Sequence, residues 1–265
     1  MKGISRDSLV EFVDRKVAWV FAAVVVVSLL VVVLTGSIET NLQIDSSGGL
    51  EMDELNEALG NPALKGFSAF MSVMIFLAVM ASAGLVPRMF EKGRAEFYLS
   101  KPISRPSLLL NKLFGIWTVY SGAVLIGGGL IYACLGLVHG ITDASIVVLM
   151  LLSLITLFIW LTITCFFGLL SGSTGIAIMA AFLFWVVEGI IGYREMFKEL
   201  LKSRIADIVL DAMYYLFPKV SATSDVFLTI AAGREVSDWT PVWTTFLFAL
   251  AMVIGSVWLI KQKDF

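Results

Sequence analysis

The chain has 265 residues, of which 58% are hydrophobic and only 15% are charged, and its mean hydropathy is +0.91. These values exclude an ordinary soluble domain and indicate a membrane protein. The net charge of −2 does not identify a partner, and no stretch of the sequence has the basic character of a nucleic-acid-binding surface.

Six apolar runs are predicted to cross the membrane. A bilayer core of ~30 Å needs about 20 apolar residues in an α-helix. Their unbroken apolarity excludes the alternating pattern of a membrane β-barrel. We therefore predict an all-α polytopic fold with six transmembrane helices in a single domain, residues 1–265. The runs are 17–38, 67–87, 113–138, 144–170, 175–192 and 241–260, and only 175–192 holds an ionisable residue, Glu188.

The distribution of Lys and Arg predicts that both termini are cytoplasmic. Four of these residues lie in 1–16, six in 88–112 and two in the C-terminal tail, whereas the opposite side holds seven. Six of those seven lie in 194–239, which weakens the contrast, but cytoplasmic loops carry the excess of basic residues. Residues 17–38 are too long for the apolar part of a signal peptide, so we expect an uncleaved first span.

Three segments outside the spans have helical patterns. In 1–16, apolar residues at helical spacing predict an amphipathic helix along the inner membrane face, with an ordinary solvated tail as the alternative. The acidic loop 39–65 predicts a small outer helix ending at Gly60, and a docking surface for a partner is the alternative. In the outer segment 194–239, residues 194–217 predict one or two amphipathic helices that lie at the outer surface, or dip partly into the membrane, and roof the bundle, with Pro218 ending the pattern.

Isolated polar residues give little evidence of catalysis. Intramembrane ionisable residues are costly, which makes Glu188 a candidate for proton or substrate handling. Pairing of Glu188 with Arg194 or Lys198 is the alternative. His139 has no second metal ligand nearby and is predicted to be a surface turn residue. Cys134 and Cys165 fall inside spans, which favours neither a disulfide framework nor a metal site.

Several glycines lie in the third and fourth predicted spans. Gly127, Gly128 and Gly129 allow close helix approach, and Gly168 with Gly172 has the GxxxG spacing of packed membrane helices.

The sequence has no G-x-x-x-x-G-K-[ST] phosphate loop. A nucleotide-driven function would therefore need a second polypeptide.

The segment 88–112 is the most charged stretch between two apolar runs. It reads Glu-Lys-Gly-Arg-Ala-Glu over 91–96, Leu-Ser-Lys-Pro-Ile-Ser-Arg over 99–105 and Leu-Leu-Leu-Asn-Lys over 108–112. These stretches resemble the inner loop of ABC transporter permeases of the type 2 export family, and the Lys-Gln-Lys-Asp-Phe ending resembles the usual ending of that family. Ser104 and Pro106 predict the start of the third membrane helix.

The resemblance implies a permease that pairs with separate cytoplasmic ATPase subunits. Two ATPases, which bind ATP and Mg²⁺, and two permease copies would form the working unit in the inner membrane of a prokaryote. The segment 88–112 would be the cytoplasmic coupling segment, with its coupling helix around 93–100. Its charged side chains would make polar contacts with the ATPase, and its aromatic and apolar side chains would anchor it. The residues predicted to couple are Arg88, Lys92, Arg94, Glu96, Phe97, Tyr98 and Leu99.

The layout also resembles the permease of the transporter that serves maturation of the nitrous oxide reductase copper site. No Met, Cys or His cluster in this sequence would bind copper directly, so no metal substrate is assigned. Three functions stay open: export of a substrate, a membrane mechanotransmitter acting on an extracytoplasmic accessory protein, and a proton-coupled carrier using Glu188. Plain contact with membrane lipids explains the Val-, Leu-, Ile- and Phe-rich spans as well as a lipid-like cargo does.

Overall fold

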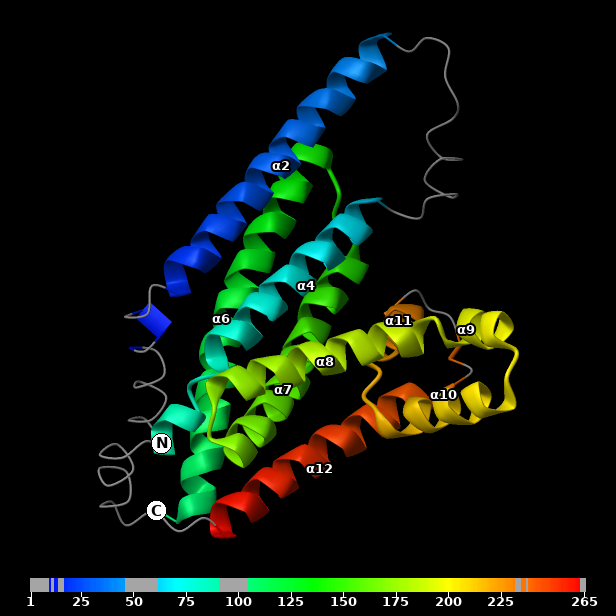
Figure 1. Cartoon of the computed structure of the whole chain (residues 1–265). Helices are drawn as coiled ribbons and strands as arrows, with labels where there is room; N and C mark the ends of the chain where they lie inside the picture. The colour runs from blue at the N-terminus through cyan, green and yellow to red at the C-terminus, as the bar shows by residue number, and fades with distance from the viewer. Residues whose placement is uncertain are drawn as a thin grey trace.

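All regular elements in the described part of the chain are helices. The computed structural model describes residues 10, 12–13, 17–45, 62–90, 104–231, 235–236 and 238–262. Six helices are long and apolar enough to cross a membrane, which confirms the predicted all-α fold with six spans. They are α2 (Val17–Asp45), α4 (Pro62–Ser82), α6 (Arg105–His139), α7 (Ala144–Ser171), α8 (Thr174–Gly192) and α12 (Thr240–Gln262) (Figure 1).

Several helix boundaries differ from the expected apolar runs, among them the end of α2 at Asp45. α6 begins at Arg105, directly after Ser104 and with Pro106 in its first turn, so the predicted start is confirmed. The apolar run 113–138 is only the lipid-compatible part of this longer helix. The run 67–87, by contrast, is not one helix, since α4 ends at Ser82 and a turn leads into the short 3₁₀-helix η1 (Pro87–Phe90). Pro87 disfavours helical backbone at the residue before it, which fits this break.

α7 lies at the centre of the bundle. It packs against α4, α6, α8 and α12, and against the shorter helix α11 (Val220–Ala231). Leu157 and Ile163 have no exposed surface. The buried hydroxyl of Thr162 donates to the Ile159 carbonyl at 2.7 Å, which satisfies a polar group in an apolar environment.

α2 lies at the edge of the bundle and faces outward. Its main packing partner is α6, and among its described side chains only Phe21 and Val25 are buried. The ring of Phe12 meets those of Phe21 and Tyr120 at centroid distances of 5.7 and 5.2 Å, which ties the segment before α2 to α6.

His139 is not a plain surface turn residue. It is the last residue of α6, it is half-buried, and its Nε2 lies 3.1 Å from the carbonyl oxygen of Val32 in α2. This polar contact joins α6 to α2 near the end of α6. Apolar membrane helices have few other polar groups with which to make such contacts.

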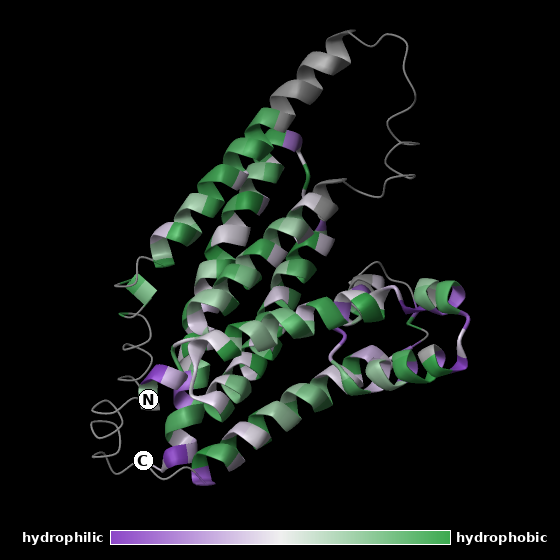
Figure 2. Ribbon diagram, viewed as in Figure 1, coloured by the Kyte–Doolittle hydropathy of each residue, from purple (hydrophilic) through white to green (hydrophobic). Residues whose placement is uncertain are grey.

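Hydrophilic residues gather at the two ends of the bundle (Figure 2). One end holds η1, the start of α6 and the end of α12. The other end holds two short helices, α9 (Arg194–Leu201) and α10 (Arg204–Leu216), which are joined by an ion pair of 2.7 Å between Lys198 and Asp211. In 194–217, where one or two amphipathic helices were expected, the structure has α9 and α10, and α11 follows after Pro218.

The glycines of the spans have different roles. A Cβ on Gly127 would lie 2.8 Å from Met74 Cε, and one on Gly128 would collide with Met71, so both allow α6 and α4 to approach closely. Gly129 has no such neighbour. Gly172 does not pack as half of a GxxxG pair; it ends α7 in the left-handed conformation with φ 66°.

Candidate functional site

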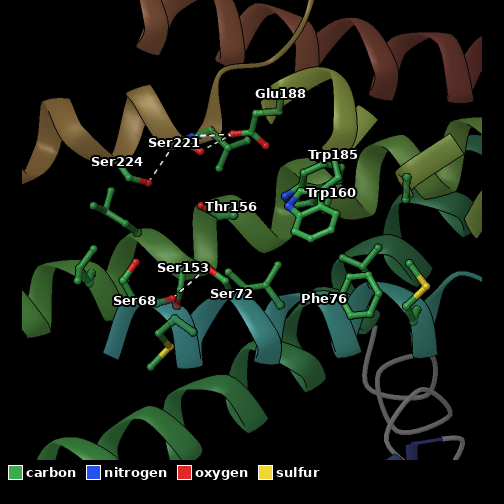
Figure 3. Close-up of a pocket in the computed structure, with 18 of the residues that line it drawn as sticks. Ser68, Ser72, Phe76, Ser153, Thr156, Trp160, Trp185, Glu188, Ser221 and Ser224 are labelled. Atoms are coloured by element: carbon green, nitrogen blue, oxygen red, sulfur yellow. Dashed lines mark hydrogen bonds between the residues drawn. The ribbon is translucent and has the colours of Figure 1, made fainter. Parts of the chain in front are cut away.

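A groove of about 250 Å³ lies between α4, α7, α8 and α11 (Figure 3). Each helix contributes one face, because the lining positions recur at helical spacing: Ser68 and Ser72 on α4, for example, are four residues apart. The groove unites three kinds of side chain, which are hydroxyls, carboxylates and aromatic rings. Its polar lining residues are Ser68, Ser72, Ser153, Thr156, Ser221, Ser224, Glu188 and Asp225.

Glu188 holds the beginning of α11 against α8. Its Oε1 accepts a hydrogen bond from the Ser221 backbone N–H at 2.7 Å and another from the Ser221 hydroxyl at 2.9 Å (Figure 3). The first N–H groups of a helix lack intrahelical partners, and a negative charge is favourable at this end. Lys198, one of the two expected partners of Glu188, pairs instead with Asp211, and the carboxylate of Glu188 accepts from Ser221.

Further hydrogen bonds fix α11 on α12. The backbone N–H of Lys219 donates to Thr245 Oγ1 at 2.9 Å. The Thr223 hydroxyl donates to the Lys219 carbonyl oxygen at 2.7 Å and also lies 3.1 Å from the Pro241 carbonyl oxygen of α12. All of these groups are buried, so their polar atoms need such partners. α11 is therefore positioned from both sides, by Glu188 on α8 and by the first turns of α12.

Three hydroxyls in the groove donate their single proton to a carbonyl oxygen of their own helix. Ser72 donates to the Ser68 carbonyl at 2.9 Å, Ser153 to the Met150 carbonyl at 2.6 Å, and Ser224 to the Val220 carbonyl at 3.0 Å. A hydroxyl has one proton and two lone pairs. These groups therefore offer only acceptor lone pairs to a ligand in the groove.

Aromatic side chains line another part of the same groove. Phe76 on α4 and Trp185 on α8 have ring centroids 5.9 Å apart, and the largely buried Trp160 of α7 lies beside them (Figure 3). Phe76 and Trp185 are both partly exposed. Asp225 of α11 also lines the groove; it is exposed, and partial desolvation by the surrounding helices raises the pKa of its carboxyl above its usual value.

A second feature is the seat of η1 at the other end of the bundle. A Cβ on Gly168 of α7 would lie 2.8 Å from Pro87 Cγ, and one on Gly84 would lie 3.1 Å from the Thr174 side chain at the start of α8. The missing side chains of these two glycines let η1 and the turn before it lie directly on the junction between α7 and α8. The chain that leads into 91–103 is thus packed against the central helix.

Comparison with known families identifies the chain. The model of the family described as "ABC-2 family transporter protein" matches residues 4–265. The chain belongs to this family. It is a membrane permease of an ABC transporter, and permeases of this family generally partner with ABC ATPase subunits. A search of curated proteins found no match.

In this ABC-2 permease, most residues predicted to couple lie outside the described part of the chain. Lys92, Arg94, Glu96, Phe97, Tyr98 and Leu99 are among these, so their role stays a prediction. Arg88 is described: it is exposed on η1, next to the seat on Gly84 and Gly168. Glu188 is far from this end and belongs to the groove.

Sequence reasoning missed most of the groove. It singled out Glu188 but not Asp225, Ser221 or Ser224, which share one face of α11 at spacings of one, three and four residues. The signal was present as pairs of hydroxyl residues three or four apart inside apolar runs, such as Ser153 with Thr156. Such pairs place hydroxyls on one side of a membrane helix.

Proposed function

We propose that this permease works with two cytoplasmic ABC ATPase subunits and a second copy of itself, and couples their ATP hydrolysis to export of a substrate from a prokaryotic cell. ATP and its Mg²⁺ would bind the ATPases. The family match over residues 4–265 carries this proposal. The absence of a phosphate loop in the sequence supports a separate energy source.

The seat of η1 supports a route for coupling. A push on the segment that follows η1 would act on Gly168 of α7 through Pro87, because the two are in direct contact. α7 also lines the groove with Ser153 and Trp160. Packed cores are bistable rather than continuously deformable, so a shift of η1 is expected to move α7 and α8 as units.

Co-purification with an ATPase tests the proposal. The double variant Arg94→Ala with Phe97→Ala is expected to reduce both ATPase association and ATP-dependent transport, because interface anchors are enriched in Arg and aromatic residues. A matched control, Arg204→Ala with Tyr193→Ala, removes the same kinds of exposed side chain at the other end of the bundle. If the first variant keeps both association and transport, the coupling assignment is wrong.

A second candidate function is favoured by the surface of α9 and α10. Seven large apolar residues are more than half exposed there: Met196, Leu200, Leu201, Ile205, Ile208, Tyr215 and Leu216. A mechanotransmitter would use such a surface to act on an extracytoplasmic accessory protein. ATP hydrolysis that requires a soluble outer protein would favour this function, and ATP-dependent flux in vesicles without one would count against it.

A further inference from the structure

The groove between α4, α7, α8 and α11 presents hydrogen-bond acceptors far more than donors. The protons of Ser72, Ser153 and Ser224 are directed to carbonyls of their own helices. Ionised carboxylates, such as those of Glu188 and Asp225, are acceptors only. The polar wall is therefore complementary to a ligand that donates several hydrogen bonds.

The charges of the groove-lining residues also favour a ligand that donates hydrogen bonds, and specifically a cation. None of these residues is basic, and two are acidic. Among the described residues, the Asp225 carboxylate has no ion-pair or hydrogen-bond partner. The Glu188 carboxylate is hydrogen-bonded to Ser221 and to the backbone next to Ser221. Neither carboxylate has a basic partner among the groove-lining residues, and a bound cation would neutralise them there.

The aromatic end of the groove defines the rest of the ligand. Trp160, Trp185 and Phe76 give an aromatic wall in the same groove as the carboxylates. Aromatic faces attract organic cations and also pack against apolar or aromatic groups. A bare metal ion or a proton would leave this wall unused, and an anion would be repelled by the carboxylates.

We propose that the groove binds an amphipathic primary amine, with its ammonium group at Glu188, Asp225 and the hydroxyls and its apolar body against Trp160, Trp185 and Phe76. The ammonium supplies three donors for the carboxylates and for the hydroxyls whose own protons are directed to carbonyls of their helices. A volume of about 250 Å³ suits a small organic group of this kind. That the amine is the transported cargo rests on the proposed function, whereas its binding does not.

Direct binding to the full chain tests the site. The permease is reconstituted in phosphatidylcholine nanodiscs without an ATPase, and binding of radiolabelled 2-phenylethylamine is measured by equilibrium dialysis against empty nanodiscs at neutral pH. At this pH the amine is protonated, because alkylamines have pKa values near that of lysine, ~10.4. Its uncharged counterpart, 2-phenylethanol, is measured in parallel. The amine is expected to bind at least about tenfold more tightly than the alcohol, a difference of about 1.4 kcal/mol.

Carboxamide variants locate the site. Asp225→Asn and Glu188→Gln are each expected to weaken amine binding about tenfold. Glu188→Gln keeps a side-chain oxygen that accepts from Ser221, and Asp225→Asn breaks no contact with described residues, so both are expected to fold. Asp207→Asn on α10, outside the groove, is the matched control and is expected to change affinity less than twofold.

Three results would overturn the proposal: no binding of the amine above empty nanodiscs at millimolar concentration, equal binding of the alcohol, or unchanged affinity in both Asp225→Asn and Glu188→Gln. The outcome is separable from that of the proposed function. If the amine binds as expected but the permease with its ATPase does not move it in vesicles upon addition of ATP, the site stands and the amine is not cargo.

Discussion

α7 and α2 are both long apolar helices, yet they occupy opposite environments. Half of the α7 span is buried inside the protein, against 11% of the α2 span. The α2 span, Val17–Leu34, is nevertheless the more apolar of the two spans. In a soluble protein the more apolar helix would be expected in the core.

The difference shows what apolarity means in a bilayer. Lipid chains are as apolar as Leu, so hydropathy reports contact with lipid and not burial in protein. α7 can carry Ser153, Thr162 and Thr164 because its neighbours and its own carbonyls satisfy them. α2, with Val26, Val27 and Leu30 facing outward, has no such shelter and is made almost wholly of apolar residues.

The largest expected effect comes from truncating the buried helix. Leu157→Ala in α7 removes a side chain with no exposed surface, and we expect it to lower the free energy of unfolding by about 2–5 kcal/mol through a cavity. Leu30→Ala in α2, where Leu30 is 57% exposed, is expected to cost far less. Equilibrium unfolding in mixed micelles measures both. Equal costs would contradict the contrast between the two helices.

Adding a side chain to α7 tests the seat of η1. Gly168→Val places a Cβ 2.8 Å from the rigid ring of Pro87, and overpacking of this kind costs about 1–3 kcal/mol. The variant is also expected to reduce ATP-dependent transport more than it reduces ATPase association. Gly122→Val in α6, where a Cβ meets nothing within 4 Å, is the control for adding the same side chain to a membrane helix.

Glu188→Ala tests how α11 is held on the central helices. Loss of the carboxylate leaves the Ser221 N–H without its partner, and losing such a cap costs about 0.5–2 kcal/mol. Glu188→Gln retains an acceptor and is expected to cost less. Hydrogen exchange at the first turn of α11 should rise in the Ala variant alone; equal exchange in the two variants would show that the carboxylate does not hold this helix.

The smallest effect is expected from Lys219, between α10 and α11. Burial, and to a lesser extent the nearby Arg194, lower the pKa of Lys219 to about 8, and its Nζ lies 3.9 Å above the Tyr214 ring. Because the folded state holds fewer protons than the unfolded state between about pH 8 and 10.5, stability should rise with pH across this window. In Lys219→Met this rise should disappear. Thermal unfolding at several pH values measures it, and parallel curves for the two proteins would argue against a depressed pKa.

The spans were predictable because a membrane helix is recognised from the summed hydropathy of about 20 consecutive residues. Residues 144–170 and 175–192 match α7 and α8 within one residue at each end. The break after Ser82 was not predicted, since an apolar turn has the same hydropathy as an apolar helix. The signal for it was Pro87, whose effect on the preceding backbone depends on geometry and not on composition.

The groove was harder to predict because it is a property of four helices together. Glu188 stood out alone, since one carboxylate in an apolar run is visible without neighbours. Ser221 and Asp225 lie in a segment that is polar enough to look like an outer loop, and only the fold brings this segment against α7. The partner of Glu188 is 33 residues away, which spacing within one helix cannot reveal.

The length of α6 has a mechanical consequence. With 35 residues at 1.5 Å each, α6 is ~52 Å long, whereas the bilayer core is ~30 Å thick. It begins one residue after the undescribed stretch 91–103 and runs unbroken to the end at which His139 meets α2. An unbroken helix acts as a stiff shaft, so a tilt imposed at Arg105 would swing the His139 end through a comparable arc in the opposite sense. Such a lever would let a displacement on one face of the membrane reach α2 on the other without any rearrangement inside α6.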